Sequence, residues 1–168
     1  MALPAADNNN GGQFTTHHIV DTYVRGKALS VVYTNDLVLV ESSIQTMEHF
    51  LAEDKYRVVG FDLEYTIGRA GHNQKVVVTQ LCMRHDVLVY HYHLATRPCK
   101  CFSRFINSSD YSFATVDTTN DLKVLKVSDL KCPNLVNIQH HYMVWGSDKN
   151  KLNSLVDLAS AIIDNYYT

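Results

Sequence analysis

Two acidic residues stand inside an apolar run, VVGFDLEYT, from Val58 to Thr66. Residues two apart in a strand project from the same face, so we expect Asp62 and Glu64 to point to one side together. Carboxylate oxygens are the ligands that hard divalent ions such as Mg²⁺ and Mn²⁺ prefer. Because a charge inside an apolar strand needs a compensating partner, the stretch predicts a metal site. A solvent-facing edge strand would explain the same pattern without a metal.

A third acid is expected near this pair. The segment from Ser112 to Leu125, SFATVDTTNDLKVL, has the pattern of a strand, a turn and a helix. We expect Asp121 to open this helix and to approach Asp62, because the strand before it would lie beside the central strand. The helix dipole by itself also favours an acid at such a position, and Asp117 is a rival candidate. The sequence leaves these alternatives open.

Other reactive constellations are weaker. The four cysteines, Cys82, Cys99, Cys101 and Cys132, contain no C-x-x-C pair, and the nine histidines do not have the spacing of a common zinc module. The sequence also lacks a Gly-rich phosphate loop and a G-x-S-x-G nucleophile elbow. Hydrolysis through a nucleophilic side chain is therefore disfavoured.

One predicted strand is rich in rings, because Tyr90 and Tyr92 alternate with His91 and His93. Aromatic side chains on one face could stack on the bases of a single-stranded nucleic acid. Aromatic residues also favour strands for packing reasons alone, which is the more ordinary explanation.

The elements that position the acids follow from hydrophobic periodicity. Strands are expected over residues 18–24 and 28–33 as a hairpin turning at 25–27, and over 57–65, 75–83, 87–93, 112–116 and 135–139. Helices are expected after a Ser42/Gln45 capping box, near 102–106 and 121–126, and from 152 to 166 with Ser147 or Asp148 as the cap. From residue 57 onward the order is β-β-β-α-β-α-β-α. Three antiparallel strands leading into α/β units predict an α/β fold, a mixed sheet flanked by helices, which is the order of the ribonuclease H-like fold.

The bulk properties predict one compact domain. The chain has 168 residues and a formal net charge of -2, which argues against a nucleic-acid binder that works through a basic tail. Residues 1–15 are expected to form a flexible tail, and residues 16–168 the domain. The N-terminal MALPAADNNNGGQ lacks the pattern of a signal peptide, and the sequence has no apolar run of membrane-spanning length. We therefore expect a protein of the cytoplasm, the nucleus or both, without a membrane partner and with reduced thiols.

Four segments together, GFDLEY, VVVTQLC, VLVYHYH and FATVDTTNDLKVL, resemble the DnaQ-like 3′–5′ exonuclease domain of the DEDD superfamily. The resemblance runs from about residue 57 to residue 166 and is greatest to Werner-syndrome-type exonucleases, particularly their small plant relatives. It implies that Asp62 and Glu64 form the first acidic motif and Asp121 the second. It also implies two Mg²⁺ or Mn²⁺ ions and an in-line attack of water on single-stranded RNA or DNA. Nucleoside monophosphates would leave from the 3′ end.

The chain departs from this family pattern at three places. Tyr65 stands where the family usually has Trp, and Thr115 and Asp117 stand where it usually has Gly. The Y-x-x-x-D motif that supplies the last ligand is not found before Thr168, which implies a C-terminally truncated domain. Two functions therefore remain: an exonuclease, with a homo-oligomer as one way to complete the site, or a catalytically inactive nucleic-acid-binding or oligomerising module that retains the fold.

Overall fold

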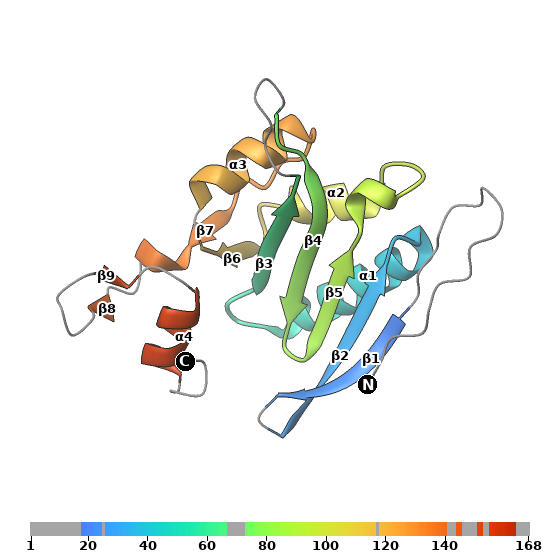
Figure 1. Ribbon diagram of the computed structural model, residues 1–168. Coiled ribbons are helices and arrows are strands. Elements are labelled where there is room, and N and C mark those ends of the chain that lie inside the picture. The colour runs from blue at the N-terminus through green and yellow to red at the C-terminus, as the bar shows by residue number, and fades with distance from the viewer. Residues whose placement is uncertain are drawn as a thin grey trace, which may run out of the picture.

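The structure is a computed structural model, and it describes residues 18–24, 26–66, 73–116, 118–140, 144–145, 151–152 and 155–163. Within these residues, a seven-stranded mixed sheet has the order β1-β2-β5-β4-β3-β6-β7 (Figure 1). Its strands are β1 (His18–Val24), β2 (Lys27–Thr34), β3 (Val58–Tyr65), β4 (Val76–Met83), β5 (Asp86–Tyr90), β6 (Ser112–Thr115) and β7 (Leu135–Asn137). The predicted tail over residues 1–15 lies outside the described residues.

The helices are α1 (Leu37–Glu53), α2 (Lys100–Ile106), α3 (Thr118–Val127) and α4 (Leu155–Ile162). Two single 3₁₀ turns cover Tyr92–Leu94 and Ile138–His140, and β8 (Val144–Trp145) pairs with β9 (Lys151–Leu152) as a separate ribbon. Among the described residues, no helix is long and apolar enough to cross a membrane.

The order of strands and helices from β3 onward confirms the predicted mixed α/β fold. Strand β3 pairs antiparallel with β4, and β4 pairs antiparallel with β5. On its other side β3 pairs in parallel with β6, which pairs in parallel with β7. The two parallel connections run through helices, as parallel strands require. Strand β3 is therefore central, with neighbours on both sides.

The N-terminal hairpin extends this sheet in a way that the sequence did not indicate. Strands β1 and β2 are antiparallel, with Val24 opposite Lys27, so the loop between them has two residues. Gly26 has a φ of 75°, a left-handed conformation that glycine adopts without strain and that type I′ hairpin loops use at their second residue. Strand β2 then pairs in parallel with β5, which places the hairpin at the edge of the sheet.

Helices α1, α2 and α3 share one hydrophobic core with the sheet, and Figure 1 shows α1 and α2 on the same side of it. Aromatic rings connect the layers: Phe113 of β6 makes edge contacts with Phe61 of β3 and with Phe105 of α2. The buried residues that face this core from the helices are Val40, Ile44, Met47, Leu51, Phe102, Phe105, Ile106, Val124 and Leu125.

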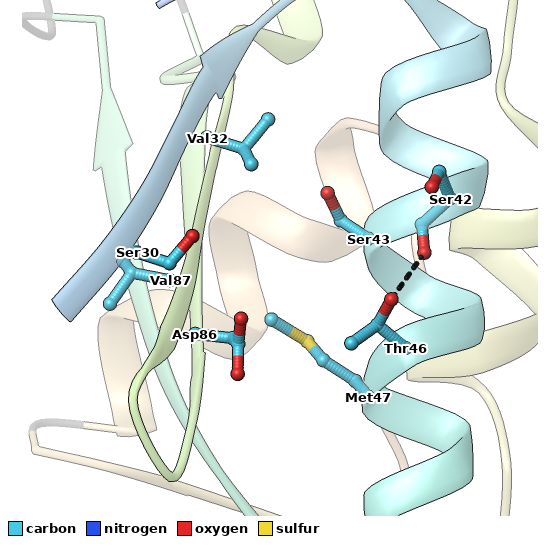
Figure 2. Close-up of a pocket in the computed structure, with 8 residues that line it drawn as sticks. All are labelled: Ser30, Val32, Ser42, Ser43, Thr46, Met47, Asp86 and Val87. Carbon is cyan, nitrogen blue, oxygen red and sulfur yellow. Dashed lines mark hydrogen bonds between the residues drawn. The ribbon is translucent and has the colours of Figure 1, made fainter. Parts of the chain in front are cut away.

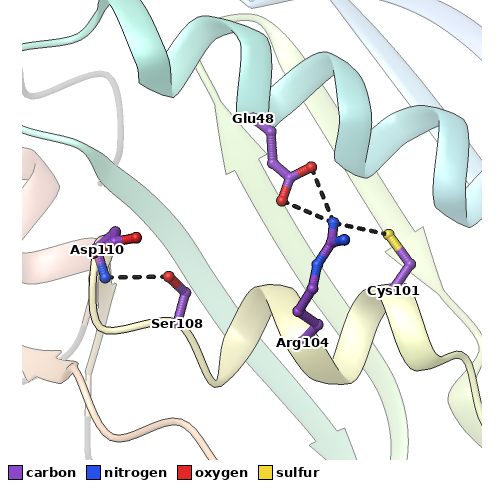
Figure 3. Close-up of polar contacts among 5 residues, drawn as sticks. All are labelled: Glu48, Cys101, Arg104, Ser108 and Asp110. Atoms are coloured by element: carbon purple, nitrogen blue, oxygen red, sulfur yellow. Dashed lines mark hydrogen bonds and ion pairs between the residues drawn. The ribbon is translucent and has the colours of Figure 1, made fainter.

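Polar contacts at the surface add little to this core. Arg104 of α2 donates from Nη2 to both carboxylate oxygens of Glu48 on α1, at 3.0 and 3.2 Å (Figure 3). Because the Arg104 side chain is largely exposed, this pair contributes at most about 1 kcal/mol. Packing of the apolar helix faces therefore determines how α1 and α2 meet.

Four element boundaries differ clearly from prediction. Helix α1 begins before the expected Ser42/Gln45 capping box, because Asp36 accepts hydrogen bonds from the backbone N–H groups of Val38 and Leu39 and caps the helix there. Helix α3 begins at Thr118, so Asp121 lies within its first turn and does not open it.

Strand β5 ends at Tyr90, and the chain then turns into the 3₁₀ segment, in which the N–H of Leu94 donates to the carbonyl of His91. Tyr92 therefore does not continue the strand as predicted. Leu152 belongs to β9, so the last helix starts later than expected, and its predicted caps, Ser147 and Asp148, lie outside the described residues.

The face of the sheet opposite α1 and α2 is called the open face here. Strand alternation places on it half-buried and exposed side chains, whereas their neighbours along each strand face the core. The residues of the open face are Val31, Tyr33, Gly60, Asp62, Glu64, Val78, Gln80, Cys82, Val87, Val89 and Ala114.

Substitution of Tyr90 by Phe is expected to raise the free energy of unfolding by about 1 kcal/mol. The Tyr90 hydroxyl is buried and has no hydrogen-bond partner among the described residues, so its removal relieves an uncompensated desolvation. Burial, with smaller effects of Cys99 and Tyr92, raises the pKa of Tyr90. Tyr90 therefore ionises in the unfolded chain at a lower pH than in the folded protein. The wild type loses stability as pH rises above about 10, while Tyr90→Phe loses less.

Urea denaturation at pH 7 and pH 10.5 measures both effects, with the exposed Tyr23→Phe as the control. A Tyr90→Phe variant less stable than wild type would contradict this.

Alkylation is expected to distinguish an exposed cysteine of the sheet from a cysteine buried in the core. Cys82 lies on the open face and is exposed, whereas Cys132 is buried and burial raises its pKa to about 12. Iodoacetamide at pH 8 should label Cys82 slowly, since burial of its sulfur and the nearby Asp86 also raise its pKa. Cys132 should react only after unfolding in urea. Peptide mass spectrometry measures the order, and native labelling of Cys132 ahead of Cys82 would contradict the arrangement.

Candidate active site

The central strand presents the two predicted acids on the open face. Val59, Phe61 and Leu63 are 0%, 4% and 5% exposed and pack in the core, so the alternating Asp62 and Glu64 point the other way and are exposed. This confirms that the two carboxylates project from one face. Solvent reaches both, so neither charge is buried without compensation.

Asp62 has a neighbour that sequence reasoning did not single out. Gln80 of β4 lies directly opposite Asp62 in the antiparallel register, and its Nε2 donates to Asp62 Oδ2 at 3.4 Å. The distance is at the long end of the hydrogen-bond range, so the amide orients the carboxylate only loosely. The sequence predicts both strands, over residues 57–65 and 75–83. Only the observed register between them shows that Gln80 lies opposite Asp62.

An irregularity in the sheet lies beside Glu64. The β3–β4 register shifts between Glu64, which is opposite Val78, and Tyr65, which is opposite Val76. One extra residue, Val77, is therefore inserted in β4, as in a β-bulge. Bulges bend a strand and redirect its side chains, and they are frequent next to active sites. The Glu64 side chain therefore leaves the sheet next to a local bend.

Asp121 is placed differently from the other two acids. It is 6% exposed, and its Oδ2 lies 3.3 Å from Thr115 Oγ1, whose single hydroxyl hydrogen is shared between Asp121 and the carbonyl of Val116 at 3.2 Å. Thr115 is buried and alternates with Ala114, so it lies on the same side of β6 as Phe113, the core side. Strand β6 does lie beside β3, as predicted, with Ala114 next to Gly60. The Asp121 carboxylate is nevertheless buried at the β6–α3 junction, next to Thr115, which lines the same pocket as Asp62. Asp117 lies outside the described residues.

The three carboxylates fit a divalent ion by chemistry but not by arrangement. Oxygen donors suit Mg²⁺ and Mn²⁺. In the part of the chain that the structure describes, however, no three His, Cys, Asp or Glu side chains are grouped so that they could hold a metal ion. Asp62 and Glu64 share the open face, whereas Asp121 is bonded to Thr115. A three-carboxylate metal site is therefore not formed in this structure.

A pocket of about 360 Å³ opens next to Asp62. Its floor is the open face around Gly60, Gln80 and Cys82, and Ile138 and Leu155 of α4 also line it. The lining thus combines one carboxylate, one amide, the Cys82 thiol and the Thr115 hydroxyl with apolar surface, a composition typical of ligand pockets. A second pocket lies on the opposite face, between the β2–β5 pair and α1 (Figure 2). Half of its lining residues carry hydroxyl groups, and it contains no predicted site residue.

Several solved structures have the same fold at low sequence identity. The catalytic core of RRP6 from Trypanosoma brucei is 12% identical, with a TM-score of 0.60, over 80% of this chain and 34% of that one. The EXD2 exonuclease domain soaked in Mn and GMP is 12% identical, with a TM-score of 0.54, over 79% and 69%. Trypanosoma brucei RNase D in complex with GMP is 15% identical, with a TM-score of 0.57, over 79% and 41%.

These likenesses confirm the ribonuclease H-like fold, a mixed sheet flanked by helices. The chain spans about a third of the RRP6 core and less than half of RNase D, so it corresponds to one part of those proteins. No curated protein sequence matches the chain.

A family model described as 3′–5′ exonuclease matches residues 37–166, from the start of α1 to beyond the end of α4. The matched segment contains β3 with both exposed acids, the β6–α3 junction with Asp121, and the pocket residues between them. The chain belongs to the 3′–5′ exonuclease family.

Proposed function

We propose that this protein hydrolyses single-stranded RNA or DNA from the 3′ end and releases nucleoside monophosphates, with Mg²⁺ or Mn²⁺ as cofactor. The observation that carries the proposal is the pair of exposed carboxylates, Asp62 and Glu64, on the central strand of a 3′–5′ exonuclease domain. Asp121 is proposed as the third ligand. The motifs GFDLEY and VVVTQLC support a place within the Werner-type branch of the family.

The use of metal ions is supported by the donor atoms and by the relatives. Crystal structures are known of the EXD2 exonuclease domain soaked in Mn and GMP or in Mg and GMP, and of RNase D in complex with GMP. A phosphodiester is negatively charged and would be repelled by Asp62 and Glu64 alone. A divalent cation between the carboxylates and the phosphate removes this repulsion, which is why two exposed acids on one face suit such a substrate only with metal present.

The pocket beside Asp62 supports a single-stranded substrate. Its lining offers Gln80 as a hydrogen-bonding group and Ile138 and Leu155 as apolar contacts. A base or sugar could occupy this space while the phosphate lies over the carboxylates. The described lining contains no Lys or Arg, so we propose that binding close to the acids depends on the metal and on base contacts rather than on ion pairs to phosphate.

The second candidate function is a module that binds nucleic acid or oligomerises without catalysis. The observation that favours it is the Asp121 carboxylate, which is buried and hydrogen-bonded to Thr115 instead of meeting Asp62 and Glu64. A metal-ligating carboxylate can keep a hydrogen bond to one of its oxygens, so metal binding by all three acids requires Asp121 to approach Asp62 and Glu64, not to lose Thr115. The two candidates therefore differ in what Asp121 does, and this can be measured.

The first prediction concerns activity. A 5′-labelled single-stranded RNA or DNA incubated with the protein and Mn²⁺ should shorten from its 3′ end, and EDTA should stop the reaction. Asp62→Asn and Glu64→Gln should each lower the rate by at least about 100-fold, because each removes a charged oxygen donor at the reacting phosphate. Asp110→Asn is the matched control, since Asp110 is exposed on a turn away from the open face. A folded protein that leaves both substrates intact at high concentration would contradict catalysis.

The second prediction uses Thr115 and Asp121 to separate the two candidates. Thr115→Val removes the hydroxyl that donates to Asp121 and should destabilise the fold by about 1–3 kcal/mol, since a buried acceptor loses its donor. If Asp121 acts in catalysis, Asp121→Asn should lower the exonuclease rate at least about 10- to 100-fold, the loss expected even for outer partners of a metal.

The exonuclease rate and the urea midpoint are measured for both variants. Asp121→Asn with a wild-type rate would assign Asp121 a structural role only. A wild-type midpoint for Thr115→Val would show that the hydrogen bond does not contribute to stability.

A further inference from the structure

Two rings meet at the β2–β5 side of the open face, far from the acids in sequence. Tyr33 of β2 and His91, the residue after β5, have ring centroids 4.3 Å apart and an interplanar angle of 64°, an edge-to-face contact. Both side chains are half-buried. The backbone holds this pair in place, because the N–H of His91 donates to the carbonyl of Thr34 at 2.9 Å.

Strand alternation assigns Tyr33 to the same face as the acids. Val32 packs against the core and Thr34 is fully buried, so Tyr33 between them points to the open face. His91 follows the buried Tyr90 and contacts Tyr33, which places it on this face too. The expected stacking residues Tyr90 and Tyr92 instead make ring contacts with Phe102 in the core.

The register joins the rings to the candidate active site in one row across the sheet. Asp62 is opposite Gln80, Gln80 is opposite Val89, and Val89 is beside Tyr33. Neighbouring strands are about 4.8 Å apart, so three steps separate Asp62 from Tyr33 by about 14 Å. The residues between them are an amide and a valine, neither of which carries a charge. The row thus leads from carboxylates, over a neutral surface, to aromatic rings.

We propose that Tyr33 and His91 form a base-stacking platform for a single-stranded nucleic acid whose 3′-terminal phosphodiester lies at Asp62 and Glu64. This inference rests on the proposed exonuclease function and adds where the strand approaches the site. Every base can stack on an aromatic ring, whether its sugar is ribose or deoxyribose. The platform therefore selects unpaired strands but does not select a base sequence. A duplex keeps its bases stacked on each other and cannot use it.

The state of His91 is consistent with stacking rather than with phosphate binding. Burial, and then the neighbouring His93, lower its pKa, so its ring is neutral at neutral pH. A neutral imidazole offers a ring face to a base but no charge to a phosphate. Binding through these residues should therefore be insensitive to salt, unlike binding through cations.

The test measures binding separately from hydrolysis. Fluorescence anisotropy with a short labelled single-stranded DNA or RNA in Ca²⁺, a divalent ion that carboxylates also bind, gives the dissociation constant of the full chain on a probe shown to stay intact. Tyr33→Leu and His91→Leu should each weaken binding about 5- to 100-fold, the effect of removing one stacked base contact. Tyr33→Phe, which keeps the ring, should bind as the wild type does. Tyr23→Leu is the matched control, since Tyr23 is an exposed tyrosine of the neighbouring strand β1.

Salt dependence and kinetics complete the test. The slope of binding against salt concentration should be the same for wild type, Tyr33→Leu and His91→Leu, and Tyr33→Leu should raise KM more than it lowers kcat. Wild-type binding by both Leu variants, shown to be folded by circular dichroism, overturns the platform. A reduced salt slope in His91→Leu overturns stacking in favour of a phosphate contact.

The exonuclease proposal and the platform proposal can be refuted separately. Loss of binding in the ring variants combined with no cleavage by wild type would keep the platform and remove the exonuclease. Cleavage by wild type with unchanged binding in the ring variants would do the reverse. A wild type that binds no single strand at all overturns the platform, while the cleavage assay still decides the enzyme.

Discussion

The alternation of side chains along β3 is the constraint on which the rest of the structure depends. Val59, Phe61 and Leu63 are buried on one side, each stabilising the fold by roughly 1.5–3 kcal/mol, and Asp62 and Glu64 necessarily face the other way. A slip of one residue would expose the apolar set and bury both acids. Because β3 has hydrogen-bonded neighbours on both sides, its register also determines which residues of β4 and β6 accompany the acids.

The two faces of the sheet give the same residue type different roles. On the open face, solvent hydrates the Asp62 carboxylate, and a single long hydrogen bond from Gln80 accompanies it. On the core side, Asp121 is almost inaccessible to water, and the Thr115 hydroxyl provides one of the hydrogen bonds that water would otherwise donate. An exposed acid is available to a cation from solution, whereas binding at a buried acid requires the cation to lose more of its hydration water. The free-energy cost of bringing a cation to Asp121 therefore separates the two candidate functions, an exonuclease and an inactive module.

Pairings between distant segments extend the site beyond the central strand. The parallel contact of β2 with β5 brings Tyr33 beside His91, although 57 residues lie between them in the sequence. It also extends the open face from β4 and β5 onto β2. The relatives share this fold at 12–15% identity, because a sheet tolerates substitution as long as the pattern of core and surface positions is kept.

Local patterns in the sequence determined much of this protein: the order of elements from β3 onward, the hairpin turn at Gly26, and the shared face of Asp62 and Glu64. These depend on periods of two or 3.6 residues, which a short window contains. Only the tertiary structure decided that β2 joins β5, that Gln80 lies opposite Asp62, and that Asp121 turns toward Thr115. Each of these results from strand register or from competition for a hydrogen-bond donor between segments far apart in sequence. Such interactions are selected by the packing of the whole sheet, and no local window of residues contains them.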